Sequence, residues 1–267
     1  MVNLQPLTAT ELPNGLLANF DPGPVRRSGD LLAPSPFLLL GDHAGRAVPA
    51  SLNGLGLDAS ARGRHIAVDI GVEELGLALG ERLGAPFLRQ AYSRLVIDCN
   101  RNPARADAIP HISDGTLIPG NAALAGSARQ ARVTAIFEPY HQAITAALDA
   151  REAAGRETIL IALHSFTPVM GGQARACQIG VLHGGGRGAF ALALLARLRE
   201  QTRFRVADNE PYALDDTDYT VPAHAYARDL RYVELEIRQD LIGPSSARGV
   251  ERLSDLLAEA LAFCARD

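Results

Sequence analysis

Residues that bind metals and move protons follow two apolar runs of the sequence. The run FLLLG is followed by Asp42, His43 and Arg46, and the run ILIAL is followed by His164 and Ser165. Two imidazoles and one carboxylate make up a three-ligand zinc site, in which the fourth position is left for water. The metal lowers the pKa of that water to about 7 and polarises a carbonyl oxygen. The pattern therefore indicates metal-dependent hydrolysis.

Two glutamates interrupt a later apolar run. Glu234 and Glu236 alternate with Val233, Leu235 and Ile237, as in a strand with one face in the core. A buried charge without a partner costs free energy, so this acidic pair favours a functional role for the histidines as well. A carboxylate near the metal can take the proton of the water and return it to a leaving nitrogen. The alternation does not separate Glu234 from Glu236.

A third apolar run, RLVID, leads to Asn100 and Arg101. The planar guanidinium group of an arginine matches a carboxylate with two hydrogen bonds. An arginine beside an asparagine therefore suits a substrate that carries a carboxylate.

Apolar runs and amphipathic stretches alternate along the chain. We expect strands at residues 36–41, 94–100, 158–165, 177–183 and 232–238. We expect helices at residues 69–84, 128–155, 187–201 and 246–267. Asp69 is placed to cap the first of these helices and Gly84 to end it, while Pro139 is expected to kink or divide the second.

This alternation predicts an α/β fold with three αβα layers and a mostly parallel, mixed sheet. In such open sheets ligands bind beyond the carboxyl ends of the strands, where the polar residues are expected. Residues 1–34, rich in Pro, Gly and Asn, are expected to form an irregular N-terminal arm. Residues 35–267 show no internal repeat and no linker, which predicts a single α/β domain.

Composition excludes several classes of function. The formal charge of −4 and the pI of about 6.0 argue against a general nucleic-acid or membrane-surface role. No apolar run reaches the 18 or so residues of a membrane span, and the N-terminus lacks a signal-peptide pattern. Three scattered cysteines, Cys99, Cys177 and Cys264, form no CxxC pair and favour a reduced, cytoplasmic setting.

Several motifs together resemble the N-formylglutamate amidohydrolase family, most closely its branch of predicted members. They occur in the order DHAGRAVP, HIAVDIGVEELG, YSRLVIDCNR, LHSFTPVMGG, NEPYALDDTDYT and ELEIRQDLI, from about Phe37 to the C-terminal helix. That family is related in fold to zinc carboxypeptidases and aspartoacylases. The resemblance implies a zinc-exopeptidase-like fold with one zinc ion per chain.

The resemblance also implies a set of metal ligands. His43 and His164 correspond to the histidine ligands, and Asp69 to the carboxylate ligand, with Glu73 as the alternative if Asp69 only caps its helix. Zinc carboxypeptidases have a glutamate ligand three residues after the first histidine. In this chain that position is Arg46, which is assigned to substrate binding instead.

Other roles follow from the same resemblance. Glu236 corresponds to the general base and acid, and Arg94 to a cation for a carboxylate or for the developing oxyanion. Asn100 and Arg101 correspond to a clamp on the substrate carboxylate. Residues 209–212 form either the rim of the pocket or an ordinary turn.

The activity that the resemblance implies is zinc-dependent hydrolysis of the amide bond of a small N-acyl amino acid, such as N-formylglutamate. The partner is then a small-molecule substrate. The sequence leaves open whether the chain forms a homo-oligomer. One alternative is a carboxypeptidase-type or deacylase-type hydrolase of the same fold that acts on another amide. A second is a protein that binds a metal or ligand on this fold without catalysis.

Overall fold

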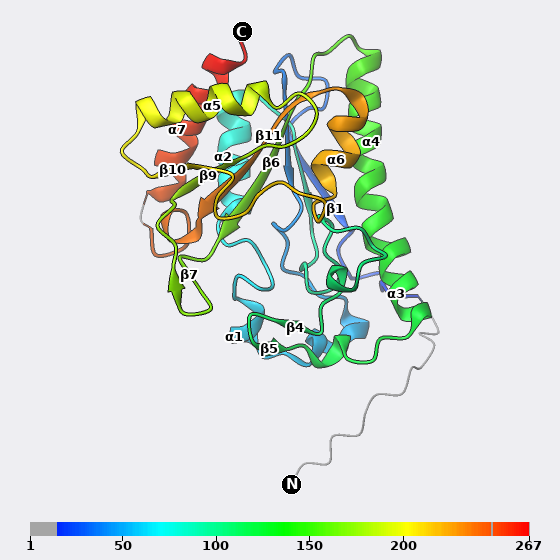
Figure 1. Cartoon of the computed structure of the whole chain (residues 1–267). Coiled ribbons are helices and arrows are strands. Elements are labelled where there is room, and N and C mark those ends of the chain that lie inside the picture. Colours follow the sequence, from blue (N-terminus) through cyan, green and yellow to red (C-terminus); the bar gives the residue numbers. More distant parts are fainter. Residues whose placement is uncertain (1–14, 247, 267) are drawn as a thin grey trace.

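The structure is a computed structural model that describes residues 15–246 and 248–266 (Figure 1). A central sheet contains the strands β1 (Val25–Ser28), β2 (Phe37–Gly41), β3 (Phe87–Gln90), β6 (Ile159–Phe166), β9 (Ile179–Leu182), β10 (Val206–Asp208) and β11 (Arg231–Arg238). Their order across the sheet is β1-β3-β2-β6-β11-β9-β10. Neighbouring strands are parallel in the series β3-β2-β6-β11 and in the pair β9-β10. The strand β1 pairs antiparallel with β3, and β9 pairs antiparallel with β11.

Helices cover both faces of this sheet (Figure 1). On one face α2 (Val72–Leu83), α5 (Ala189–Gln201) and α7 (Gly249–Cys264) pack together, and α4 (Glu138–Ala153) lies on the other. The prediction of three layers around a mostly parallel sheet is therefore confirmed. Among the described helices, none has both the length and the apolar character needed to cross a bilayer.

Shorter elements connect these layers. The remaining α-helices are α1 (Ala59–Arg62), α3 (Gly126–Arg132) and α6 (Thr220–His224). Two small hairpins pair β4 (Ile112–Ser113) with β5 (Thr116–Leu117) and β7 (Val169–Met170) with β8 (Gln173–Ala174). Short 3₁₀ segments lie at Ala50–Gly56, Ala106–Ala108, Pro119–Asn121, Tyr226–Arg228 and Gln239–Leu241.

The sequence predicts the long helices with two differences. The expected helix 69–84 begins only at Val72, with Gly71 as its N-cap, and ends as predicted at Gly84 in the left-handed region (φ 58°). The expected helix 128–155 is divided, because a π-helical turn at Val133–Phe137 separates α3 from α4 just before Pro139. A proline removes one backbone donor, so the regular hydrogen-bond pattern cannot run through it.

The strand predicted at residues 94–100 is wrong, because the strand of this region is β3, which ends at Gln90. Residues 95–100 are nevertheless buried, so a loop enclosed by the core contains an apolar run like that of a strand. The loop is held by the buried Arg132, whose Nη1 donates to the carbonyl of Val96 (2.9 Å) and to Oδ1 of Asn121.

The N-terminal segment also differs from the irregular arm that composition suggests. Residues 1–14 lie outside the described residues. Within the rest, Val25–Ser28 form β1 and pair with β3 at the edge of the sheet.

The two faces of β6 and β11 have different surroundings. On β11, Val233, Leu235 and Ile237 belong to the apolar core beneath α2, α5 and α7. The alternate residues Glu234 and Glu236 point to the face of α4, since successive side chains of a strand point to opposite faces. On the α4 face the apolar core includes only Leu160, Ala162 and Tyr232 of these two strands, so the two glutamates border a cavity and not a helix.

The loop after β2 packs closely against the segment after β3. A Cβ atom on Gly45 would lie 2.2 Å from the backbone carbon of Ala91, so only glycine fits at this contact. We expect Gly45→Ala to lower the free energy of unfolding by about 1–3 kcal/mol, because rigid backbone must move to admit the methyl group. Chemical denaturation measures this change.

The matched control is Gly126→Ala, because a Cβ atom on Gly126 meets nothing within 4 Å. This control should leave the unfolding midpoint unchanged or raise it slightly, since alanine favours a helix. Equal stability of the two variants would contradict the close contact at Gly45.

Candidate active site

A cavity of about 500 Å³ lies at the carboxyl ends of β2, β6 and β11. Such an edge is where open α/β sheets bind ligands. Most of the residues that the sequence singles out line it: His43, Arg94, Asn100, Arg101, His164, Glu234 and Glu236.

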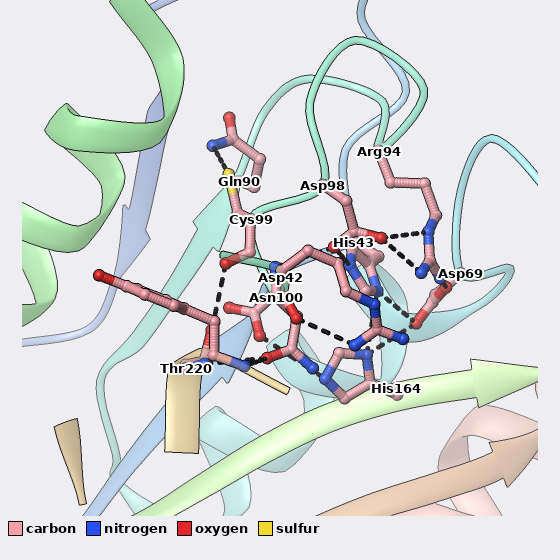
Figure 2. Close-up of polar contacts among 12 residues, drawn as sticks. Asp42, His43, Asp69, Gln90, Arg94, Asp98, Cys99, Asn100, His164 and Thr220 are labelled. Atoms are coloured by element: carbon pink, nitrogen blue, oxygen red, sulfur yellow. Dashed lines mark hydrogen bonds and ion pairs between the residues drawn. The ribbon is translucent and has the colours of Figure 1, made fainter. Parts of the chain in front are cut away.

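Three donor atoms converge beside this cavity (Figure 2). Nδ1 of His43 lies 3.1 Å from Nδ1 of His164, which lies 3.1 Å from Oδ2 of Asp69. The third separation, from Nδ1 of His43 to Oδ2 of Asp69, is 3.5 Å. Tetrahedral zinc with bonds of about 2.0–2.2 Å requires ligand atoms about 3.3 Å apart. These three buried side chains therefore have the spacing of a tetrahedral metal site.

A carboxylate lies behind each histidine. Nε2 of His43 is 2.7 Å from Oδ1 of Asp98, and Nε2 of His164 is 3.6 Å from Oδ2 of Asp42. Asp42 in turn accepts a hydrogen bond from the hydroxyl group of Tyr140 (2.7 Å). Carboxylates in this position fix the orientation of imidazole rings that bind metals. Asp98 in this way directs Nδ1 of His43 toward Asp69, whereas Nε2 of His164 has no hydrogen-bond partner among the described residues.

Asp69 is held in a loop and does not cap α2. Its backbone N–H donates to the carbonyl of His43 (3.0 Å), and its Oδ2 accepts from the backbone N–H of Ser165 (3.1 Å). Gly71 follows with φ 84°, and a Cβ atom there would lie 2.5 Å from the carbonyl oxygen of Ile242. A left-handed glycine thus lets the chain turn from Asp69 into α2.

Arg94 links two of these carboxylates, as Figure 2 shows. Its Nη2 donates to Oδ2 of Asp98 (2.6 Å), and its Nη1 lies 3.4 Å from Oδ1 of Asp69. Burial raises the pKa of Asp98, but the charges of Arg94 and His43 outweigh it and hold that pKa well below its usual range. Asp98 is therefore ionised when it contacts His43.

His164 lies in a strongly negative environment. Burial lowers its pKa, but Glu234, Asp42 and Asp69 together raise that pKa well above the ordinary value. Burial likewise opposes ionisation of Asp42, yet its contacts with His164 and His43 lower its pKa to about 2. The surroundings of His164 thus favour positive charge, which a metal cation also supplies.

Glu234 and Glu236 are both buried, with exposed fractions of 2% and 6%. Among the described residues, Oε2 of each lacks a hydrogen-bond partner. Burial raises the pKa of both carboxyl groups to about 8, although the charge of His164 opposes this shift. Glu236 is paired with His164 in the register of β11 and β6, and Glu234 with Ala162.

Asn100 and Arg101 line the cavity, but Asp218 already contacts both. Nδ2 of Asn100 is 3.1 Å from Oδ1 of Asp218, and Nη1 of Arg101 is 3.0 Å from the same oxygen. Oδ1 of Asn100 accepts from the backbone N–H groups of Tyr219 and Thr220. Asn100 therefore positions the segment around Asp218 as well as facing the cavity.

Two other candidates lie elsewhere. Arg46 is exposed and does not line the cavity, so the structure does not bring this predicted substrate contact into the site. Glu73 lies on α2, where it pairs with Arg89 of β3 (2.9 Å) and Arg26 of β1 (3.5 Å), away from the histidines. Of the segment 209–212, Tyr212 lines the cavity.

Sequence reasoning gave no role to three residues that the structure places at the site. Asp42 and Asp98 follow apolar runs, which is a usable signal, but their contacts with the histidines depend on the fold. Asp218 lies within a motif of the family, yet no local pattern indicates that it would meet Arg101.

Comparison with known proteins identifies the family. The family model described as N-formylglutamate amidohydrolase matches residues 35–243. The crystal structure of a gene product from Agrobacterium tumefaciens has a TM-score of 0.86 and 34% sequence identity, covering 93% of this chain and 98% of that chain. N-formylglutamate amidohydrolase from Ralstonia eutropha JMP134 shares the fold, with a TM-score of 0.65 and 20% identity, covering 91% of this chain and 99% of that chain. No curated protein matches the chain. The chain belongs to the N-formylglutamate amidohydrolase family.

Proposed function

We propose that this chain hydrolyses the amide bond of a small N-acyl amino acid, such as N-formylglutamate, with a zinc ion held by His43, Asp69 and His164. The observation that carries the proposal is the convergence of their three donor atoms within 3.5 Å of one another. Membership of the family supports amide hydrolysis. Residues 35–267 would then work as one domain.

The donor set suits zinc, because two imidazole nitrogens and one carboxylate oxygen leave a fourth position for a small molecule. Zinc bound there would act as a Lewis acid on the amide carbonyl and would lower the pKa of a water molecule. Asp98 and Asp42 would keep the imidazoles in the tautomer that presents Nδ1 as a ligand.

Glu236 is the residue that would move the proton. Its Oε2 has no partner among the described residues and can accept the proton of the attacking water. The same oxygen would return that proton to the nitrogen of the leaving amine. A pKa of about 8, raised by burial, suits a group that must both gain and lose a proton near neutral pH.

Two arginines would bind the substrate. Arg101 uses Nη1 for Asp218, for the carbonyl of Thr217 and for its own neighbour Asn100, so in the described part of the chain its contacts involve one end of the guanidinium group. The other end is proposed to hold the α-carboxylate of the substrate. Arg94 is proposed to stabilise the charge that develops on the amide oxygen.

The first prediction concerns metal content. His43→Ala, His164→Ala and Asp69→Asn should each lose most of about one zinc ion per chain, because each removes one of three ligands. Glu73→Gln is the matched control and should retain the metal, since Glu73 pairs with Arg89 instead. Elemental analysis after dialysis measures the occupancy. Full occupancy in the Asp69→Asn protein would remove Asp69 from the ligand set.

A second prediction separates an enzyme from a binding protein. Glu236→Gln should retain zinc but lower kcat by roughly 10²- to 10⁴-fold on an N-formyl amino acid, because the amide cannot carry the proton. The exposed Glu74→Gln should behave like the native chain. Equal turnover by the native and Glu236→Gln proteins would exclude Glu236 as the proton carrier.

A third prediction concerns the carboxylate clamp. Arg101→Ala should lower kcat/KM by roughly ten- to a hundredfold on a substrate with a free α-carboxylate, the size of one charged hydrogen bond. On the corresponding methyl ester the variant and the native chain should be nearly equal. Zinc content should not change, and Arg203→Ala, at an exposed position, is the control. An equal loss on the acid and the ester would assign Arg101 a structural role.

A further inference from the structure

His141 is a buried histidine on α4 that no step of the proposed mechanism uses, and it does not line the cavity. Its Nε2 donates to the backbone carbonyl of Cys99 (2.9 Å), and its Nδ1 lies 2.9 Å from Nε2 of the buried His224 on α6. The two rings are stacked, with an angle of 11° between their planes. The pair therefore connects α4 and α6 with the segment that leads to the clamp residues Asn100 and Arg101.

The contacts of this histidine pair fix its protons. A carbonyl oxygen only accepts hydrogen bonds, so Nε2 of His141 carries the hydrogen that it donates to Cys99. Burial lowers the pKa of both histidines, that of His224 to about 4, so both rings are neutral near neutral pH. A neutral imidazole has one donor and one acceptor nitrogen, so Nδ1 of His141 accepts from Nε2 of His224. His224 thus holds His141 in the tautomer that can donate to Cys99.

His141 contacts both segments that form the clamp. Cys99, whose carbonyl it binds, directly precedes the two clamp residues in the chain. Tyr219 directly follows Asp218, whose carboxylate contacts both clamp residues. The rings of His141 and Tyr219 meet edge to face, with their centroids 4.8 Å apart. One buried side chain therefore lies against the clamp segment and against the segment that supplies its carboxylate.

Hydrogen bonds join these two segments directly. Oδ1 of Asn100 accepts from the backbone N–H groups of Tyr219 (3.0 Å) and Thr220 (2.9 Å). The hydroxyl group of Thr220 lies 3.5 Å from the carbonyl oxygen of Cys99, the same oxygen that His141 binds (Figure 2). A displacement of either segment would therefore move the other.

The direction of the Arg101 guanidinium group depends on both segments. Its Nη1 donates to Oδ1 of Asp218 (3.0 Å) and to the carbonyl of Thr217 (3.1 Å). The other end of the group is the one proposed to hold the α-carboxylate of the substrate. A guanidinium group makes two parallel hydrogen bonds to a carboxylate only when the two planes are aligned. A small movement of the segments would therefore weaken this contact.

We propose that His141, supported by His224, is a positioning residue that holds Asn100 and Arg101 in the orientation that binds the α-carboxylate of the substrate. This inference rests on the proposed function, because it concerns the clamp on that substrate. His141 acts through Cys99 and Tyr219, neither of which is a proposed zinc ligand. Its loss should therefore affect substrate binding and leave the zinc content unchanged.

The test compares two variants of His141 in the zinc-loaded protein. His141→Leu removes both hydrogen bonds of the ring, whereas His141→Gln retains an N–H donor for the carbonyl of Cys99. The substrates are N-formyl-L-glutamate, with a free α-carboxylate, and its α-methyl ester. His141→Leu should raise KM for the acid roughly two- to tenfold, the range of one neutral hydrogen bond, with little change in kcat. It should leave KM for the ester nearly unchanged, and His141→Gln should restore most of the affinity for the acid.

A double-mutant cycle shows whether His141 acts through Arg101. In a protein that already carries Arg101→Ala, His141→Leu should raise KM for the acid no further, because the group that it positions is gone. Additive losses would assign His141 an independent structural role and overturn the inference. An equal loss on the acid and the ester, or no loss on the acid, overturns it as well.

Two controls accompany these variants. Gln142→Ala, at the exposed neighbouring position on α4, should behave like the native chain. Leu198→Ala removes a core side chain of α5 on the other face of the sheet, so it lowers stability without touching the clamp. Any effect of Leu198→Ala should be the same on the acid and on the ester. If His141→Leu does not fold, His224→Leu takes its place: it should raise KM for the acid alone, and an unchanged KM overturns the inference.

Binding and turnover distinguish the failure of this inference from the failure of the proposed function. If the native chain hydrolyses neither compound, the proposed function fails, and isothermal titration calorimetry with the same two compounds tests the clamp. Tighter binding of the acid than of the ester, lost in the His141→Leu protein, then supports the inference alone. Hydrolysis of both compounds with equal KM overturns the inference and leaves amide hydrolysis intact. A native chain that neither hydrolyses the two compounds nor prefers the acid in binding overturns both.

Discussion

The parallel pairing of β2 with β6 is the constraint on which the site depends. In their register Leu40 lies beside Ala162, so His43, just beyond β2, and His164, near the end of β6, reach the same edge of the sheet. The two rings meet at 3.1 Å although 121 residues separate them. Two imidazoles this close in a buried place need negative charge or a cation nearby. The carboxylates around them follow from that need.

The two faces of the sheet have different roles: one packs the apolar core, and the other presents the polar side chains of the site. Apolar residues of both strands pack beneath α2, α5 and α7: Ile159, Ile161 and Leu163 of β6 and Val233, Leu235 and Ile237 of β11. On the α4 face the core stops partway, and His164, Glu234 and Glu236 take its place. A shift of one residue in either strand would exchange the two faces. The apolar core thus fixes the register that presents the polar side chains to the cavity.

The features that were predicted correctly are those that leave a local pattern in the sequence. Three αβα layers, the division before Pro139 and the meeting of His43, Asp69 and His164 follow from apolar runs, helix periodicity and the family motifs. The strand at residues 94–100 was predicted wrongly, because a buried loop held by Arg132 contains the same kind of apolar run. Contacts between distant segments leave no pattern in the local sequence from which they could be predicted. The pairing of Arg101 with Asp218 is of this kind, and it changes the charge that the clamp offers.

The site holds more negative charge than the fold alone would favour. Glu234 and Glu236 are buried with unpartnered oxygens, and burial raises the pKa of each to about 8. Such groups lower the free energy of unfolding, so their presence is explained by what the cavity binds and not by stability. Asp42, Asp69 and Asp98 differ, because the positive charges around them outweigh burial and lower the pKa of each carboxyl group. The proposed metal cation would balance the carboxylates nearest the histidines.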